Sequence, residues 1–190
     1  MKEELLDKKA AALQATLQLI SEQGFHGAPM SQIAERANIG VGTIYRYFSG
    51  KEDLINALYI DIKTRIARYA FRNYEEAVPV REGFKQMLSN VIHYFIENPA
   101  ELSFTEQYEN SPLITAATHE EGKRIANPLN SLFHRAVEQN LLKELPIEML
   151  GALLSGAVSS LAKLYLSGVM KLEEESLDAG LNAIWDLIKK

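Results

Sequence analysis

Apolar residues recur at intervals of three and four along almost the entire chain, and this spacing restricts the fold more than any other feature. Residues 81–97 show the pattern at Phe84, Met87, Leu88, Val91, Ile92 and Phe95. Side chains at such intervals share one face of a helix, whereas a half-buried strand needs an alternation of two that no segment sustains. The sequence therefore predicts an all-α protein of about nine helices.

Glycine and proline mark where the expected helices end. Gly24 follows the first helix, and glycine readily adopts the left-handed conformation that ends many helices. Pro128 falls inside a helix expected over residues 116–142 and should kink or divide it, because proline lacks the amide hydrogen. Two further helices are expected over residues 146–170 and 173–189.

The composition is that of a globular protein. The chain has 190 residues, of which 47% are hydrophobic, and this is enough for a sizeable core. It contains no cysteine, which excludes disulfides and thiolate metal sites. The N-terminal residues mix both charges and lack the apolar stretch of a signal peptide, so we expect a cytoplasmic protein.

The segment 149–170 is apolar enough to raise the question of a membrane span, with Lys163 as its only charge. Small residues repeat along it every four positions, at Gly151, Ser155 and Ser159, and form a ridge on which a second helix can pack closely. We therefore favour a buried interface helix over a membrane span. A second subunit is the simplest cover for such a helix.

Charge is distributed unevenly along the chain. The net charge is −5, which on its own argues against nucleic-acid binding. Residues 1–51 nevertheless hold six basic and five acidic residues, against 14 basic and 20 acidic residues in the remainder. Because only the contact face must be basic, a near-neutral N-terminal part on an acidic body is compatible with DNA binding.

Two short helices, expected over residues 29–37 and 41–48, have the pattern of a helix-turn-helix. Ala34 is small where the second helix crosses the first, and Asn38 lies at the sharp turn, where asparagine tolerates the left-handed conformation. Gly40 can cap the second helix. The expected core of this unit is formed by Ile33, Ala37, Ile39, Ile44 and Phe48.

The exposed face of the second short helix is suited to DNA. Its members are Val41, Gly42, Thr43, Tyr45, Arg46 and Tyr47. Gly42 allows the backbone to come close to a phosphate, and the hydroxyl groups can donate to phosphate oxygens. Arg46 can form two parallel hydrogen bonds with guanine. Lys51 begins the next helix, expected to run toward residue 74, beside an N-terminus that favours anions.

The N-terminal third of the chain resembles the TetR family of bacterial transcriptional regulators. The resemblance is carried by Gly24-Phe25, Ile33-Ala34, Ala37-Asn38-Ile39, Gly42-Thr43-Ile44-Tyr45-Arg46-Tyr47-Phe48 and Ser49-Gly50-Lys51-Glu52-Asp53-Leu54. It implies phosphate contacts by Thr43, Tyr45, Tyr47 and Lys51. It also implies that Val41, Gly42 and Arg46 lie over base edges, and that Ser31 and Gln32 lie near the DNA backbone.

Three positions depart from the family pattern. The family usually has glycine at Asn38, serine at Gly40 and a polar or basic residue at Val41. The first two changes are conservative for the backbone. Val41 replaces a charged contact with an apolar surface that can read a thymine methyl group, so the operator sequence does not follow from the resemblance.

The resemblance further implies a three-helix DNA-binding head over residues 1–55 and a helical body over residues 56–190 that binds a small molecule and dimerises. If a pocket exists, its apolar composition favours a hydrophobic ligand, although the same residues would also suit a plain core. The candidate pocket residues are Phe84, Met87, Leu88, Val91, Phe95, Phe104, Tyr108 and Phe133.

Dimerisation has support of its own, because helix-turn-helix proteins usually bind two half-sites one DNA turn apart. The last two helices offer a suitable surface, and an antiparallel pair from each subunit would form a four-helix bundle. The candidate interface residues are Gly151, Ser155, Ser159, Leu181, Ile184, Trp185 and Ile188.

No catalytic or cofactor motif stands out. There is no phosphate loop, triad order or paired-carboxylate pattern, so we expect neither an enzyme nor a bound cofactor. His93, His119 and His134 are possible ligand types but form no recognised site, so no metal is expected.

These observations predict a homodimeric repressor that binds double-stranded DNA at a palindromic operator and is released by a small hydrophobic ligand. An activator or a corepressor-dependent regulator would have the same sequence features. A helical carrier of hydrophobic ligands and a helical-bundle enzyme are alternatives from other classes. The polar and aromatic face of residues 41–47 favours DNA binding, because a carrier has no use for it.

Overall fold

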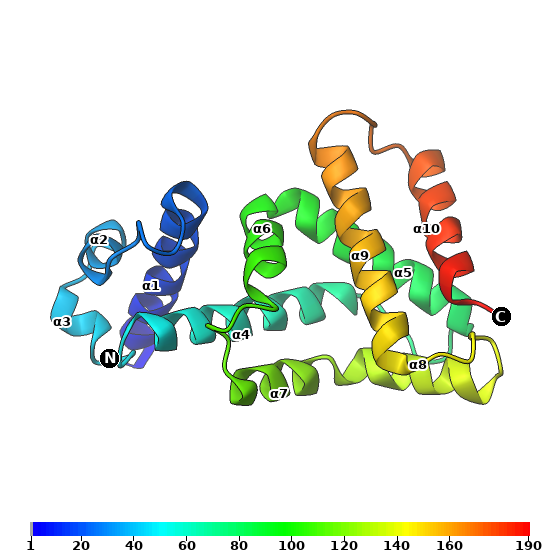
Figure 1. Cartoon of the computed structure of the whole chain (residues 1–190), viewed down its shortest axis with the longest axis horizontal. Coiled ribbons are helices and arrows are strands. Elements are labelled where there is room, and N and C mark those ends of the chain that lie inside the picture. Colours follow the sequence, from blue (N-terminus) through cyan, green and yellow to red (C-terminus); the bar gives the residue numbers. More distant parts are fainter. Residues whose placement is uncertain (1) are drawn as a thin grey trace. The chain divides into compact units, whose positions relative to one another are not determined.

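The structure is a computed structural model that describes residues 2–190, with side chains from residue 7 onward. Its regular elements are ten α-helices over these residues (Figure 1). They are α1 (Lys2–Gln23), α2 (Met30–Arg36), α3 (Val41–Ile44), α4 (Lys51–Ala70), α5 (Val80–Glu97), α6 (Pro99–Tyr108), α7 (Ala116–Ile125), α8 (Asn127–Glu138), α9 (Ile147–Leu166) and α10 (Glu174–Ile188). The prediction of an all-α fold is confirmed.

Helices α7 and α8 explain why the expected count of about nine becomes ten. The predicted helix over residues 116–142 is two helices separated at Ala126, and it ends at Glu138. Pro128 lies in the first turn of α8, where its missing amide hydrogen breaks no helical hydrogen bond. The proline therefore divides the predicted helix.

Packing separates the chain into two compact units. The first unit comprises the chain up to Lys63 together with Ala100–Gly122. The second unit comprises Thr64–Pro99 together with Lys123–Lys190. The division falls inside α4, later than the boundary expected after residue 55. The division into a DNA-binding head and a ligand-binding body after residue 55 stays a prediction, whereas the packing of residues 100–122 with the N-terminal helices is a feature that sequence periodicity does not reveal.

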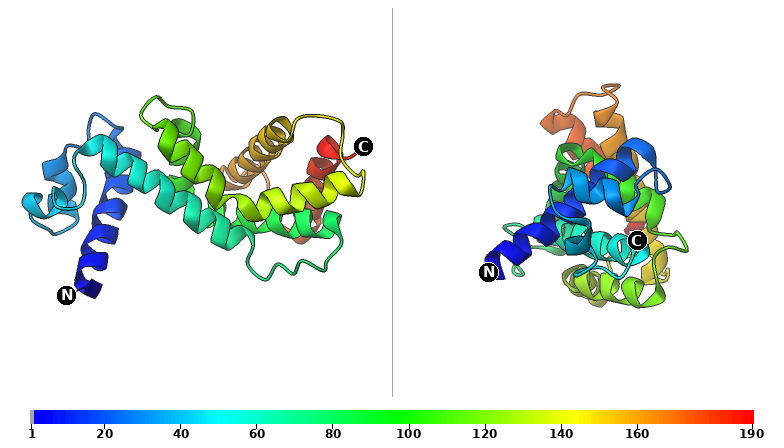
Figure 2. Two further views of the ribbon diagram at one scale, coloured as in Figure 1. Left: turned by 90° about the horizontal axis from the view of Figure 1, so that it is seen from below. Right: turned by 90° about the vertical axis from the view of Figure 1, so that its left-hand side faces the viewer.

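In the first unit, α2 and α3 lie beside α1 (Figure 2). The core of this unit consists of residues with almost no exposed surface, among them Ala12, Ile33, Ile44, Leu54, Ile55 and Leu58. Each comes from an apolar position of an amphipathic helix. Burial of this face therefore supplies the driving force that short helices such as α2 and α3 lack on their own.

The second unit is built from α5, α8, α9 and α10, together with the end of α4. Helices α9 and α10 lie side by side and run antiparallel (Figure 1). The ring of Phe84 on α5 packs edge-on against Phe133 of α8, with centroids 5.2 Å apart, and lies 5.5 Å from the ring of Trp185 on α10. These aromatic side chains join three helices in one core.

Helix α9 is the one helix among the described residues that is long and apolar enough to cross a membrane, by length and composition. One of its faces is buried inside the second unit and consists of Leu150, Leu154, Val158, Ala162 and Tyr165. Met149 and Leu153 are exposed. Helix α9 therefore has one apolar face covered by its own chain and one that is not. The predicted contact with a second subunit can involve only the uncovered face.

Candidate DNA-binding surface

The turn between α2 and α3 is centred on Asn38. Its backbone has a φ of 53°, in the left-handed region that the sequence predicts there. The amide of Ile39 donates to the carbonyl oxygen of Ala34 at 3.0 Å and closes the turn. Gly40 follows in an extended conformation as the N-cap of α3. Both residues therefore take the local roles expected from the sequence.

The helix-turn-helix has a small buried core. Ile33, Ala34, Ile44 and Phe48 are almost completely buried, while Ala37 and Ile39 are half-buried. An ion pair stabilises the outer side, since Nη1 of Arg36 at the end of α2 donates to Oε1 of Glu22 on α1 at 2.5 Å. This hydrogen bond lowers the pKa of Glu22 and raises the pKa of Arg36. Helix α2 is thus held on α1 by buried apolar side chains and by this ion pair at the surface.

Helix α3 is shorter than expected. The sequence predicts a helix over residues 41–48, but α3 ends at Ile44. The amide of Arg46 donates to Thr43 at 3.2 Å and that of Tyr47 to Ile44 at 2.9 Å, which are the tighter hydrogen bonds of a turn. The extension of the helix to residue 48 is wrong, because these turns lead the chain to Phe48 in the core.

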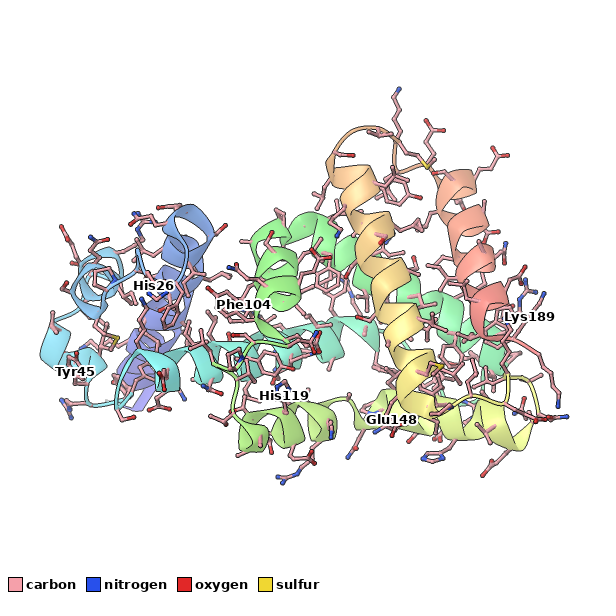
Figure 3. All side chains as sticks on the ribbon, in the orientation of Figure 1. His26, Tyr45, Phe104, His119, Glu148 and Lys189 are labelled. Atoms are coloured by element: carbon pink, nitrogen blue, oxygen red, sulfur yellow. The ribbon has the colours of Figure 1, made fainter. Side chains whose placement is uncertain are left out.

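Four members of the expected contact face are exposed. Val41 is 42% exposed and Tyr45 is 54% exposed, and Gly42 and Arg46 are also at the surface. Figure 3 labels Tyr45 at the end of α3. A methyl group placed on Gly42 would have no neighbour within 4 Å, so packing inside the chain does not require glycine there. Ser31 and Gln32 on α2 are exposed as well.

Tyr47 and Thr43 differ from their predicted exposure. Both are half-buried, and the hydroxyl group of Tyr47 has no accessible surface and no hydrogen-bond partner among the described residues. The ring of Tyr47 lies 6.3 Å from that of Phe48. The expectation of two exposed tyrosines on this face is therefore wrong for Tyr47, because the turn after α3 directs this side chain toward the core.

Lys51 at the start of α4 is directed toward the connection between α1 and α2. Its Nζ donates to the carbonyl oxygen of Phe25 and lies 4.2 Å from the centre of the Phe25 ring. Partial burial lowers the pKa of Lys51. At the same end of α4, Oδ2 of Asp53 accepts the amide hydrogen of Ser49 at 2.8 Å. Both side chains hold the start of α4 against the helix-turn-helix.

A polar face of α4, formed by Asn56, Tyr59 and Lys63, is the feature that the sequence analysis missed. Asn56 donates to the carbonyl oxygen of Leu113 at 2.8 Å and accepts the amide hydrogen of Thr115 at 2.9 Å. Lys63 pairs with Glu109. The only sequence signal is the spacing of three polar or amphipathic residues along one side of a helix, and this spacing does not identify a partner.

Tyr59 lies at the centre of that polar face. The His119 ring on α7 approaches it edge-on, with centroids 5.9 Å apart (Figure 3). A methyl group on Gly122 would lie 3.2 Å from the Tyr59 ring, so glycine permits the close approach of α7 to α4. Burial, and then the carboxylate of Glu109, raise the pKa of the Tyr59 hydroxyl.

The candidate pocket residues fall into two groups. Phe84, Met87, Leu88, Phe95 and Phe133 are buried in the second unit and Val91 is half-buried there, whereas Phe104 and Tyr108 are buried in the first unit. The rings of Phe104 and Tyr108 are stacked, with centroids 4.7 Å apart. Each group is part of the core of its own unit, and their role in ligand binding stays a prediction.

The candidate interface residues also fall into two groups, one on α10 and one on α9. Leu181, Ile184, Trp185 and Ile188 of α10 are buried inside the second unit, so they are not available as a surface for a partner. Their assignment to an interface is wrong, because the face of α10 that they form packs against the same chain. Ser155 is exposed, and Gly151 and Ser159 are half-buried, at the other side of α9.

Each of the three histidines has different surroundings. Nδ1 of His93 is 2.8 Å from the carbonyl oxygen of Ser89, His119 packs on Tyr59, and His134 is exposed on α8. In the described part of the chain, no group of three His, Asp or Glu side chains could hold a metal ion.

Two family models match the chain. The one described as "Bacterial regulatory proteins, tetR family" matches residues 12–58, and the one described as "Tetracyclin repressor-like, C-terminal domain" matches residues 79–189. The first match contains the helix-turn-helix and the start of α4. The second begins just before α5 and includes α10, so the two matches together include all the elements described above except parts of α1 and α4.

Similar proteins and structures span the full chain. An uncharacterized HTH-type transcriptional regulator of Haemophilus influenzae is 28% identical over 191 residues, which cover 100% of both chains. The crystal structure of a TetR family transcription regulator from Marinobacter aquaeolei has a TM-score of 0.92 at 21% identity over 100% of both chains. FadR from Bacillus subtilis, in complex with stearoyl-CoA, has a TM-score of 0.70 at 19% identity over 94% of this chain and 96% of its own. Both structural likenesses concern the fold.

Proposed function

Because the chain belongs to the TetR family of bacterial transcriptional regulators, we propose that it is a homodimeric repressor released from a palindromic operator by a small hydrophobic ligand. A regulator of this family is a DNA-binding protein and not an enzyme. The proposal adds the sign of regulation, the assembly, the ligand class and the contact residues, and it places the protein in the cytoplasm with its DNA.

The exposed face of α3 is the observation that carries the proposal. Val41 and Gly42 on α3, and Tyr45 and Arg46 directly after it, are all exposed, whereas Ile44 on the opposite side of α3 is buried. Arg46 is exposed, and within the described residues its side chain has no ion pair or hydrogen bond, so its guanidinium is available for a base edge or a phosphate. A surface of this kind has no role in a carrier of hydrophobic ligands.

We assign the contacts by their chemistry. Arg46 would contact guanine, Val41 a thymine methyl group, and Gly42 would let the backbone approach the DNA. Tyr45 and Thr43 would donate to phosphates, with Ser31 and Gln32 near the backbone. Lys51 and Tyr47 remain candidates for phosphate contacts, although each must first leave the position it has in the DNA-free protein.

The ligand proposal depends on the apolar interior of the chain. The candidate pocket residues are nearly all aromatic or aliphatic, and the structurally similar FadR is a complex with stearoyl-CoA, a molecule with a long apolar chain. A coupling free energy of about 1–3 kcal/mol between ligand and operator would be enough to lower operator affinity by roughly 5- to 150-fold. The ligand class is therefore proposed to be hydrophobic.

The homodimer proposal depends on the uncovered face of α9. Met149 and Leu153 are 50% and 41% exposed, and small residues lie between them and along the same helix. A second copy of α9 can approach closely on such a surface, and the pairing would place two α3 helices on one DNA duplex.

Selection of bound duplexes from a random DNA library tests the proposal. We expect enrichment of palindromic sites whose half-sites lie about one helical turn apart. Arg46→Ala should change the base preference at one position of each half-site by about 1–3 kcal/mol and leave the other positions unchanged. Recovery of unenriched sequences by the wild-type protein would refute operator binding. An unchanged base preference in the variant would show that Arg46 contacts a phosphate and not a base.

A further inference from the structure

The hydroxyl group of Tyr108, the last residue of α6, is buried without a partner. Only 2% of the surface of Tyr108 is exposed, and no described group makes a hydrogen bond with its Oη. Buried polar groups in proteins are nearly always paired, because an unpaired one loses its hydrogen bonds to water and gains nothing. Such an atom needs an explanation, and an absent ligand group is one.

Other tyrosines of this chain use their hydroxyl groups. Tyr69 donates to Glu97 at 3.2 Å, and the hydroxyl oxygen of Tyr74 accepts a hydrogen bond from Arg135 at 2.8 Å. Tyr47 and Tyr165 share the unpaired state of Tyr108, but Tyr47 belongs to the helix-turn-helix and Tyr165 on α9 lies in the second unit. Tyr108 therefore differs from most tyrosines here, and Tyr165 offers a matched control.

The surroundings of Tyr108 indicate what kind of group would pair with it. Its ring is stacked on Phe104 one turn earlier in α6, at a plane angle of 21°. Burial raises the pKa of the Tyr108 hydroxyl, which keeps it neutral and able to donate. A group that meets this hydroxyl must accept a hydrogen bond and carry an apolar part against the aromatic pair.

Charge favours a neutral acceptor over a carboxylate. Glu109 follows Tyr108 directly, and its carboxylate is already paired with Lys63. The same carboxylate is hydrogen-bonded to Tyr59. A second carboxylate buried at Tyr108 would need a cation of its own, whereas a carbonyl oxygen accepts a hydrogen bond from a neutral hydroxyl without burial of a charge.

We propose that Tyr108 is the polar anchor of the ligand site and that the ligand is a neutral hydrophobic compound with a carbonyl oxygen. The proposal rests on the ligand-released regulator proposed above. Tyr108 donates to the carbonyl oxygen, and the ring of Phe104, which is stacked on Tyr108, contacts the apolar part. Because Glu109 is bonded to two side chains of α4, a ligand at Tyr108 acts on the helix that follows the helix-turn-helix.

A pair of probe compounds of equal size tests the anchor. Butyrophenone and butylbenzene have the same number of carbon atoms, and only the ketone accepts a hydrogen bond. Calorimetric titration of the full-length protein should give a preference for the ketone of roughly three- to tenfold, the worth of one hydrogen bond. Tyr108→Phe should abolish this preference, and Tyr165→Phe should retain it.

The folded state of each variant is checked by thermal unfolding, and Tyr108→Phe should fold because it removes an atom that has no partner. As a second measurement, the carbonyl stretching frequency of bound butyrophenone should be lower in the wild-type protein than in Tyr108→Phe. An equal preference in both proteins, an equal frequency, or failure of the ketone to bind the wild-type protein would overturn the proposal.

DNA binding separates this proposal from the function on which it rests. If the wild-type protein binds its selected operator but not the ketone, the ligand class is wrong and the regulator stands. If it binds the ketone through Tyr108 but no duplex DNA, the anchor stands and the proposed function is wrong.

Discussion

Packing within the chain does not explain why Gly42 on α3 and Tyr45 directly after it occupy exposed positions. Glycine inside a helix is less stable than alanine by about 1 kcal/mol, and an alanine methyl group would fit at Gly42 without any contact. Tyr45 exposes more than half of its surface at 54%. Neither residue at these positions stabilises the isolated protein. Glycine at position 42 lets a partner approach the backbone closely, and the hydroxyl of Tyr45 can donate a hydrogen bond to that partner.

Gly42→Ala should therefore change stability and DNA affinity in opposite senses. We expect the free energy of unfolding to rise by up to about 1 kcal/mol through helix propensity. Operator affinity should fall, because the methyl group lies between the helix and the DNA. Thermal unfolding and fluorescence anisotropy measure the two effects. Ser131→Ala on the exposed side of α8 is the control and should leave operator affinity unchanged.

The two tyrosines of the helix-turn-helix should differ in their response to removal of the hydroxyl group. Tyr45→Phe should weaken operator binding by about 0.5–1.5 kcal/mol, the usual worth of one hydrogen bond. Tyr47→Phe should leave the affinity nearly unchanged and the fold as stable or more stable, since its hydroxyl has no partner. Equal losses in an anisotropy titration would show that Tyr47 turns outward on the operator.

At the scale of the helices, apolar spacing predicts nearly every element. This spacing does not predict the structure correctly where local hydrogen bonds end a helix or where tertiary packing determines which element covers a face. The helix after Gly40 stops at Ile44, because a tight turn continues the chain into the core. Leu181 and Trp185 were expected at an interface, because periodicity identifies a buried face but not the element that buries it.

The packing of residues 100–122 with the N-terminal helices is another feature that the sequence could not provide. It depends on contacts between residues far apart in the chain, such as Asn56 with Leu113 and Lys63 with Glu109. A single sequence carries no signal for such pairs. The contact face of α3 was largely predicted, because it follows from motif spacing within one short segment.

Asn56→Ala should loosen the connection between α6 and α7. The variant removes two hydrogen bonds to the backbone of residues 113 and 115, together worth about 1–3 kcal/mol. Hydrogen exchange of residues 113–118 should therefore accelerate by at least fivefold, while α9 and α10 exchange as before. Asn182→Ala, which removes a surface amide on α10, is the control, and equal exchange in both variants would contradict this role of Asn56.

At the scale of the whole molecule, we propose that the uncovered face of α9 forms the contact between two subunits. Leu153→Glu should shift the protein toward monomer in sedimentation experiments, because a carboxylate would be buried between two helices. Val137→Glu changes an apolar residue of α8 that is 52% exposed and should leave the dimer intact. A dimer that survives Leu153→Glu would show that the subunits meet at another surface.

Loss of the dimer should also weaken operator binding, because the two half-sites would then bind separate chains. The affinity of Leu153→Glu for a single half-site should stay close to that of the wild-type protein, since α3 is unaltered. Fluorescence anisotropy with half-site and full-site duplexes measures the two affinities. A full-site affinity of Leu153→Glu equal to the wild-type value would show that DNA binding does not depend on the dimer.

The salt dependence of affinity for the selected duplex tests the DNA-binding account most directly. Each phosphate that the protein neutralises releases counterions, and the slope of log K against log salt concentration steepens by about 0.9 for each contact. We predict a steep loss of affinity between about 50 and 200 mM salt for the wild-type protein. An affinity that does not change over this range would contradict binding of the DNA backbone by the helix-turn-helix.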